Sequence, residues 1–225
     1  MFKFQCQPFT LALLGSVFLL LSACQSGSGC TQGQSSCFKV AAKAKVSDAT
    51  LNSQFQYVKL SLNGNVVWIA QGAVDQWPVA NTAVYYGADR SVVKFANGRL
   101  KSLITQELSW KETQAPQVNW SYFKQDNAKA MQFQRQIDTI DGVSALQEQR
   151  QLQRIAAPKH HAYSGDSQAL VWVQETTLQS NAAKKRVAYF DTWYALHPDH
   201  AEPVYAQQCL SAKHCITWQQ WRKTP

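Results

Sequence analysis

Carboxylates are the first side chains of this sequence to consider for chemistry, because glycoside hydrolysis requires two of them facing each other. Most of the 14 acidic residues stand alone in segments that read as loops, whereas Glu175 and Asp191 fall in segments with a strand pattern. Either could be the general acid of a glycan-processing enzyme. A carboxylate hydrogen-bonded within a sheet or on its rim is more common, and no G-x-S-x-G, Walker or H-E-x-x-H motif occurs. We therefore predict no catalytic residue and no enzymatic activity.

Histidines gather in the last third of the chain, the one arrangement here that suggests a metal site. The segment 197–200 (His-Pro-Asp-His) has a spacing seen in metal loops, but its proline favours a surface turn. Cys209, His214 and Cys215 could hold zinc, yet the cysteines lack the close spacing of a zinc knuckle. We expect neither a metal nor another cofactor. The histidines concerned are His160, His161, His197, His200 and His214.

The clearest chemical signal lies at Cys24. Lys3, an apolar run over residues 11–21 and two small residues form a signal peptide. Leu21-Ser22-Ala23-Cys24 resembles the bacterial lipobox, in which the chain is cut before the cysteine and the cysteine is acylated. An ordinary signal peptide with a fortuitous cysteine is the alternative. Acyl chains would anchor the protein without a spanning helix, and Gln25, where inner-membrane lipoproteins carry Asp, points to the outer membrane.

The remaining cysteines predict disulfides. Cys6 lies in the signal peptide, which leaves four thiols in an oxidising envelope and three possible pairings. Sequence proximity favours Cys30 with Cys37 and Cys209 with Cys215. Residues 24–38, rich in Ser, Gly and Gln, read as a flexible tether.

Tryptophans offer flat faces that stack on sugar rings, although most tryptophans fill protein cores. Eight occur in the chain. From their positions we select Trp120, Trp218 and Trp221 as candidates for contact with a glycan.

Composition narrows the classes of protein. A hydrophobic content of 45% with 16% charge excludes disorder, and the apolar run over residues 9–23 is shorter than the ~20 residues of a spanning helix. Removing residues 1–23, with Lys3 as their only charged residue, leaves 202 residues and lowers the formal charge from +8 to +7. The basic residues are scattered, so nucleic acid is not an expected partner. Anionic glycans or lipid headgroups fit better, and a solvated basic surface without a partner is the alternative.

Apolar residues alternate more than they recur at helical spacing, so we predict an all-β domain of antiparallel sheets, either sandwich or barrel-like, over residues 39–225. Asn63-Gly64 and Asn97-Gly98 predict hairpin turns. Residues 40–51 are predicted to be a short helix, and residues 143–156 fit either a helix or a polar-faced strand. A boundary between two halves is placed near residues 113–118. Predicted strands cover residues 55–62, 65–71, 83–86, 91–95, 99–105, 119–123, 131–140, 168–178 and 186–196.

The order of several short motifs resembles the YjbF/GfcB family of outer-membrane lipoproteins. Residues 95–101 (FANGRLK) are similar to the family's N-G-R-L-x-K block, and Trp120 begins the second half. Residues 171–175 (VWVQE), 190–194 (FDTWY) and 203–208 (PVYAQQ) resemble its V-x-E, N-x-Y-W and R-x-S-x-Q strands, with Asp191 in place of the usual Asn. The resemblance implies an all-β, periplasm-facing lipoprotein that accompanies capsule or exopolysaccharide export machinery, without known catalytic activity.

These observations predict a lipoprotein anchored in the outer membrane by Cys24 and facing the periplasm. Its expected role is a non-enzymatic accessory of capsule or exopolysaccharide export, with anionic polysaccharide and export-machinery proteins as partners. Two alternatives stay open: a glycan-processing enzyme, and a lipid or lipoprotein carrier whose sheet encloses an apolar cavity.

Overall fold

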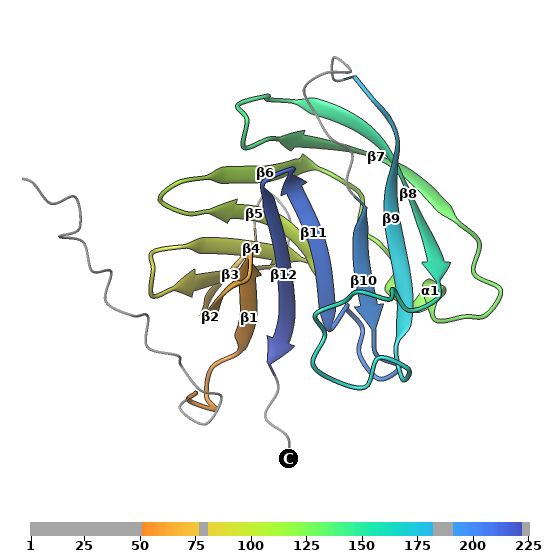
Figure 1. Cartoon of the computed structure of the whole chain (residues 1–225), viewed down its shortest axis with the longest axis horizontal. Coiled ribbons are helices and arrows are strands. Elements are labelled where there is room, and N and C mark those ends of the chain that lie inside the picture. The colour runs from red at the N-terminus through yellow and green to blue at the C-terminus, as the bar shows by residue number, and fades with distance from the viewer. Residues whose placement is uncertain (1–50, 77–80, 182–190, 222–225) are drawn as a thin grey trace, which may run out of the picture. The chain divides into compact units, whose positions relative to one another are not determined.

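Alternation of apolar and polar residues builds twelve strands and one short helix within the part of the chain that the structure describes (Figure 1). The structure is a computed structural model and describes residues 51–76, 81–181 and 191–221, which belong to one unit, Val46–Pro225. The elements are β1 (Tyr57–Leu62), β2 (Asn65–Asp75), β3 (Thr82–Gly87), β4 (Val92–Ala96), β5 (Arg99–Ile104), β6 (Ser109–Gln114), α1 (Trp120–Phe123), β7 (Met131–Asp138), β8 (Leu146–Ile155), β9 (Val171–Ser180), β10 (Thr192–Leu196), β11 (Tyr205–Ser211) and β12 (His214–Trp221).

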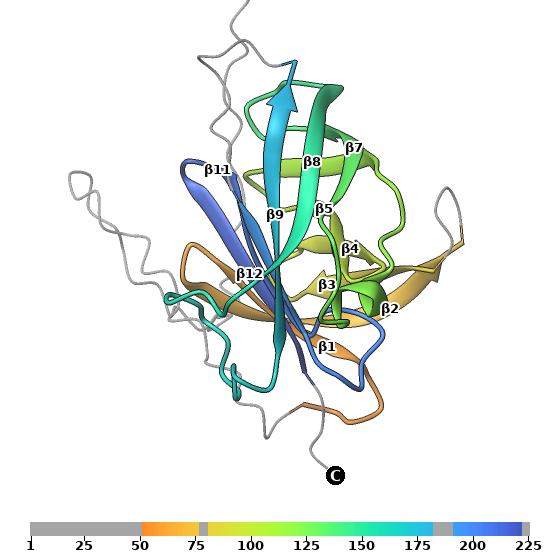
Figure 2. The same ribbon diagram turned by 90° about the vertical axis from the view of Figure 1, so that its right-hand side faces the viewer.

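Each strand pairs antiparallel with its neighbour in sequence, and pairing of β1 with β12 closes the sheet into a barrel. Tyr57 lies opposite Trp221, and Leu62 lies opposite Ile216. Figure 1 shows β1 in orange beside β12 in dark blue, and Figure 2 shows β8 and β9 running along each other. The structure confirms the all-β, antiparallel prediction and, of the two predicted architectures, shows the barrel.

Both predicted hairpin turns are present. Asn63 and Gly64 have φ angles of 50° and 84°, and Asn97 and Gly98 have φ angles of 51° and 66°, as a two-residue turn with positive φ requires. Gly98 is needed for a second reason, because a Cβ at this position would collide with the ring of Pro203. The turn between β4 and β5 is therefore packed against the segment that precedes β11.

The glutamine-rich segment left open by the sequence is strand β8. Its glutamines face outward, and one of them bonds to β7: the Gln147 Nε2 donates to the Gln136 Oε1 at 3.0 Å. Its alternate residues Leu146 and Leu152 are buried in the core. The period of two thus determines the structure of this segment.

The strand predicted over residues 119–123 is wrong, because this segment contains helix α1. Trp120 and Phe123, three residues apart, are both buried on one side of the turn, a spacing that suits a helix. Residues 113–118, where the boundary between two halves is predicted, lead from β6 towards this helix, and β6 pairs with β7. The helix predicted over residues 40–51 lies outside the described residues except for Leu51. Within the described ranges, no helix is long and apolar enough to cross a membrane.

The barrel interior has two halves that differ in chemistry. We call the first the aromatic half; it is formed by β1–β4 and β10–β12 and includes Val58, Ile69, Tyr85, Phe95, Tyr194 and Trp218. We call the second the ionic half; it is formed by β5–β9 and includes, beside apolar residues, Arg99, Lys101, Glu112, Arg135, Glu148, Arg150 and Glu175.

A second, smaller core lies on the outer face of the barrel. Residues 156–170, between β8 and β9, pack there through Tyr163 and Leu170. Their partners are outward side chains of β9 and β10 and residues at the start of β11, among them Trp172, Ala195 and Tyr205. This connection therefore forms a layer over part of the sheet.

Candidate functional site

A cavity of about 670 Å³ opens beside the aromatic half and is the candidate functional site. We call it the inner pocket. It is bounded by residues from β1–β4 and β12, by the turn between β4 and β5, and by the segment before β11. The residues that line it are Gln56, Tyr57, Val58, Gln71, Val74, Asn81, Ala83, Tyr85, Phe95, Asn97, Gly98, Ala201, Glu202, Trp218, Gln220 and Trp221.

Aromatic rings form a connected group along the inner pocket. Tyr57 and Trp221 meet edge to face with ring centroids 5.7 Å apart. Phe95 lies 5.6 Å from Tyr85 and 5.5 Å from Trp218, so three further rings contact one another in series. Trp218 is only 2% exposed and forms part of the wall, whereas Trp221 at the end of β12 is partly exposed. Such ring faces suit the apolar faces of sugars.

Amide side chains lie among these rings. The Tyr85 hydroxyl donates to the Gln71 Oε1 at 3.4 Å, and the Gln220 Nε2 donates to the Pro203 carbonyl at 3.2 Å. Asn97 is fixed by donation from its Nδ2 to the Val118 carbonyl at 2.6 Å. Amides both donate and accept hydrogen bonds, which is the property that sugar hydroxyls require of a partner.

The charge in the inner pocket is a carboxylate. Partial burial raises the pKa of Glu202, and donation by the Gly98 N–H lowers it in opposition. Burial also raises the pKa of Tyr85, and the nearby Glu202 raises it further. Among the described residues that line the pocket there is no lysine, arginine or histidine. The pocket therefore combines aromatic rings, amides and one acid.

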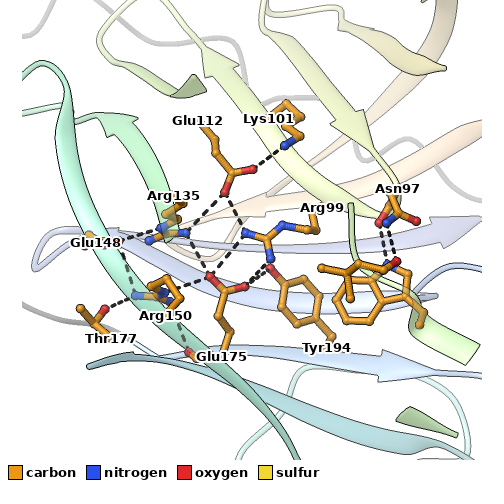
Figure 3. A network of polar contacts seen from close by, with 12 residues as sticks. Asn97, Arg99, Lys101, Glu112, Arg135, Glu148, Arg150, Glu175, Thr177 and Tyr194 are labelled. Carbon is orange, nitrogen blue, oxygen red and sulfur yellow. Dashed lines mark hydrogen bonds and ion pairs between the residues drawn. The ribbon is translucent and has the colours of Figure 1, made fainter. Parts of the chain in front are cut away.

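The ionic half contains a buried network centred on Glu175 (Figure 3). Its Oε2 accepts from the Arg99 Nη1 at 2.8 Å and from the Tyr194 hydroxyl at 3.0 Å. Its Oε1 accepts from the Arg150 Nε at 3.0 Å and from the Arg135 Nη1 at 3.3 Å. Glu175 is 0% exposed, so these contacts replace water completely.

Two further carboxylates balance the arginines. Glu112 accepts from the Arg99 Nη2 at 2.8 Å and from the Lys101 Nζ at 2.7 Å, and Glu148 accepts from the Arg135 Nε at 2.7 Å. Burial tends to raise the pKa of Glu112, but Arg99 and then Lys101 outweigh burial and lower it. These cations therefore favour the ionised form of Glu112 inside the barrel.

The environment of Glu175 does not suit a general acid. Burial would raise its pKa, but Arg99, Arg150 and Arg135 together lower the pKa to about 2. A carboxyl group that is already ionised has no proton to give to a glycosidic oxygen. Asp191 is exposed just before β10, where it accepts a hydrogen bond from the Gln174 Nε2 at 2.7 Å. The geometry at Glu175 supports the interpretation that this carboxylate is hydrogen-bonded within the sheet and stabilises the fold.

Of the three candidate tryptophans, the structure brings Trp218 and Trp221 together at the inner pocket but not Trp120. Trp120 is 1% exposed, its Nε1 donates to the Asn97 carbonyl at 2.7 Å, and its ring centroid lies 4.8 Å from that of Tyr194. Its Nε1 and its ring therefore both have their partners within the core. The structure therefore places Trp120 in the core and not at the inner pocket, and its contact with a glycan stays a prediction.

Cys209 and Cys215 form a disulfide across β11 and β12, which confirms the pairing that sequence proximity favoured. Their sulfurs are thus not thiolates for zinc, and the His214 Nδ1 lies instead 2.9 Å from the Ser211 hydroxyl. Cys24, Cys30 and Cys37 lie outside the described residues.

The histidine segment lies in the connection between β10 and β11. The rings of His197 and His200 are 4.7 Å apart, and the Lys124 Nζ donates to the carbonyls of Pro198 and His200. No group of three or more possible metal ligands occurs within the residues that the structure covers. Residues 197–200 therefore form a turn whose carbonyl groups are bound by Lys124.

Sequence reasoning missed the arginines and two of the carboxylates of the ionic half. The available signal was charge at apolar positions of an alternating strand. In β7, Arg135 occupies the position between the inward Phe133 and Ile137, and in β8 Glu148 and Arg150 occupy the positions after Leu146. Opposite charges in adjacent inward positions predict a buried network.

No protein-family model and no curated protein matches the sequence. Among solved structures, the chain is similar to the crystal structure of the hypothetical lipoprotein YmcC from Escherichia coli K12. The TM-score is 0.57 at 9% sequence identity, and the match covers 77% of this chain and 90% of YmcC. The two proteins therefore share a fold.

Proposed function

We propose that this chain is an outer-membrane lipoprotein that binds polysaccharide as a non-enzymatic accessory of capsule or exopolysaccharide export. The observation that carries the proposal is the inner pocket, where Trp218 and Trp221 lie with amide side chains around a cavity of about 670 Å³. Polar groups beside aromatic rings are the usual composition of a site for a sugar.

Anchoring is supported by two independent observations. Leu21-Ser22-Ala23-Cys24 resembles a lipobox, and the solved structure that shares the fold is of a hypothetical lipoprotein. Gln25 after the cysteine favours the outer membrane, with the domain facing the periplasm. The tether of residues 24–38 would then separate the binding domain from the lipid surface.

A role without catalysis is supported by the environment of Glu175, which is held ionised by three arginines. A carrier of apolar lipid is less well supported. The inner pocket contains the carboxylate of Glu202 and the amides of Gln71 and Gln220, polar groups to which an acyl chain offers no hydrogen bond.

The anchoring part of the proposal is tested in cells. Replacing Cys24 with Ala should release or mislocalise the protein and lower the amount of surface polysaccharide, and deletion of the gene should lower it as well. Membrane fractionation and quantification of surface polysaccharide measure both effects. Unchanged polysaccharide in the deletion strain would disprove a role in export.

The binding part is tested with the purified full chain in detergent and the polysaccharide of the producing cell. Trp221→Ala removes an aromatic ring from the rim of the inner pocket. It should weaken binding by roughly tenfold, which is about the free energy of one aromatic contact. Trp193→Ala is the matched control, because Trp193 packs in the core on the outer face and does not line the pocket. Equal affinity of Trp221→Ala and the unchanged protein would contradict the proposal.

A further inference from the structure

A second cavity, of about 440 Å³, lies on the opposite side of β1 and β12 from the inner pocket. We call it the outer cavity. It lies between outward side chains of β1, β11 and β12 and the segment of residues 156–170. It is lined by Lys59, Ser61, Asn63, Gly64, Val66, His160, His161, Ala162, Tyr205, Gln207, Cys215, Thr217 and Gln219.

Strand alternation explains why the two cavities differ. On β1, Val58 faces the barrel interior and its neighbour Lys59 faces outward. On β12, Trp218 faces inward and Gln219 faces outward, and Gln219 lies opposite Lys59. One pair of strands therefore supplies an aromatic wall on one side and a cationic, polar wall on the other.

The segment over the outer cavity is held in place by specific contacts. The Ala162 N–H donates to the Tyr205 hydroxyl at 3.1 Å, and the Ser164 hydroxyl donates to the Gln219 Oε1 at 3.0 Å. The His161 ring lies against Trp172 with centroids 5.0 Å apart. The cavity wall that carries His160 and His161 is thus packed onto the barrel.

The formal charges of the two cavities are opposite. Lys59 brings a positive charge to the outer cavity, whose lining also includes His160 and His161 but no aspartate or glutamate of the described chain. The inner pocket has Glu202 and no cation among its described lining residues. Lys59 is further positioned by the Trp68 ring, whose centroid lies 5.8 Å from its Nζ. An anion is favoured in the outer cavity and disfavoured in the inner pocket.

The rim of the inner pocket connects the two cavities. Tyr57 lies two residues before Lys59, and Trp221 lies two residues after Gln219, so each pair shares one face of its strand. Adjacent residues on one strand face are about 7 Å apart, a step that a chain of linked sugar units can bridge. A glycan in the inner pocket can therefore continue over Tyr57 and Trp221 towards Lys59.

We propose that the outer cavity binds an acidic group of the glycan, such as a uronic carboxylate, while the inner pocket holds a non-acidic part of the same chain. The inference rests on the proposed function and adds the location at which acidic sugars are recognised. Hydroxyls and amides beside the cations, from Ser61, Thr217 and Gln207, supply partners for sugar hydroxyls that a bare lipid headgroup does not need.

The test measures binding of two oligosaccharides, hexagalacturonate and the neutral cellohexaose, to the full chain in detergent by calorimetry. Lys59→Gln combined with His160→Gln should weaken hexagalacturonate binding by roughly three- to tenfold, as expected for loss of exposed charge pairs. The same variant should change cellohexaose affinity by less than about twofold. Lys111→Gln, which removes a charge from an exposed position on β6, is the matched control and should change neither.

The outcomes separate this inference from the proposed function. If the double variant binds hexagalacturonate normally while Trp221→Ala does not, the outer cavity is not the acidic subsite although glycan binding holds. If neither oligosaccharide nor the cellular polysaccharide binds, and Trp221→Ala has no effect, the proposed function itself fails. If vesicles containing phosphatidylglycerol, but not phosphatidylcholine alone, bind in a Lys59-dependent way and hexagalacturonate does not, the occupant is a membrane headgroup and the inference is overturned.

Discussion

The two halves of the barrel interior solve the same packing problem differently. In the aromatic half, rings such as Phe95 and Trp218 contact each other and leave a cavity open beside them. In the ionic half, three arginines and three glutamates fill the space with charge-assisted hydrogen bonds. Ring packing loses little when one ring lies at an opening, whereas a buried ion left without its partner is costly. The aromatic half thus leaves space in which a ligand could lie, whereas the ionic half is closed by its own charges.

The largest expected effect comes from removing the centre of the ionic half. Glu175→Ala leaves Arg99, Arg135 and Arg150 without their shared carboxylate and should lower the free energy of unfolding by about 4 kcal/mol or more. Urea denaturation measures it. Asp191→Ala, an exposed acid before the adjacent strand β10, is the control and should change stability little. Equal stability of both variants would show that the ionic half is not what stabilises the barrel.

The second largest effect is expected from acid, which should lower the free energy of unfolding by protonating the carboxylates of the ionic half. The pKa of Glu175 is about 2 in the folded chain and 4.5 when the residue has none of these contacts, as in the unfolded chain. Its contribution to the free energy of unfolding is therefore present above pH 4.5 and is lost as the pH falls towards 2. The shift corresponds to about 3 kcal/mol, and the lowered pKa of Glu112 acts in the same direction. Denaturation midpoints measured between pH 2 and 6 check this. A Glu175→Gln variant should show a flatter pH dependence, and an equally steep one would refute the assignment.

A smaller effect is expected at the disulfide between β11 and β12. Replacing both Cys209 and Cys215 with Ser opens a short loop, and the chain-entropy model gives a loss of about 2 kcal/mol. Thermal unfolding of the double variant, compared with the unchanged protein in its oxidised, disulfide-bonded form, measures it. A loss much larger than that of Glu175→Ala would reverse the order of importance proposed here.

The smallest effect on stability belongs to the inner pocket. Glu202→Gln removes the carboxylate at its mouth and should alter the free energy of unfolding by less than about 0.5 kcal/mol, as for most surface changes. The same variant should bring the pKa of Tyr85 closer to its usual value, because Glu202 contributes to raising it. Spectrophotometric titration follows the tyrosine. A strong loss of stability would mean that the aromatic half carries structural charge as well.

Much of the fold was accessible from the sequence because period-two alternation and Asn-Gly turns are local signals. They identified the hairpins at Asn63 and Asn97, although α1 was mistaken for a strand because Trp120 and Phe123 are apolar in either geometry. The candidate site was accessible only in part. Trp218 and Trp221 were selected, but no local pattern shows that Tyr57 and Glu202 meet them, since these contacts depend on closure of the sheet.

The ion pairs of the ionic half could not be predicted from the sequence for a different reason. Arg99 and Glu175 are 76 residues apart, so their pairing is visible only once the strands that carry them are arranged around the barrel. Single charges inside an alternating strand look like solvent-facing residues until their partners are known. Glu175 was noticed as a strand carboxylate, and its hydrogen-bonded position in the sheet was the interpretation that base rates favoured.

Pairing of the first strand with the last also constrains how the protein is made. Ten strands lie between β1 and β12 in the sequence, so β1 has no partner on that side until β12 is available. Contacts between such distant segments are the slowest to form during folding. Any shortened product that lacks β12 would expose the hydrogen-bonding edges of β1 and β11 and become a substrate for aggregation or proteolysis. Barrel closure thus depends on β12, the last strand of the described chain.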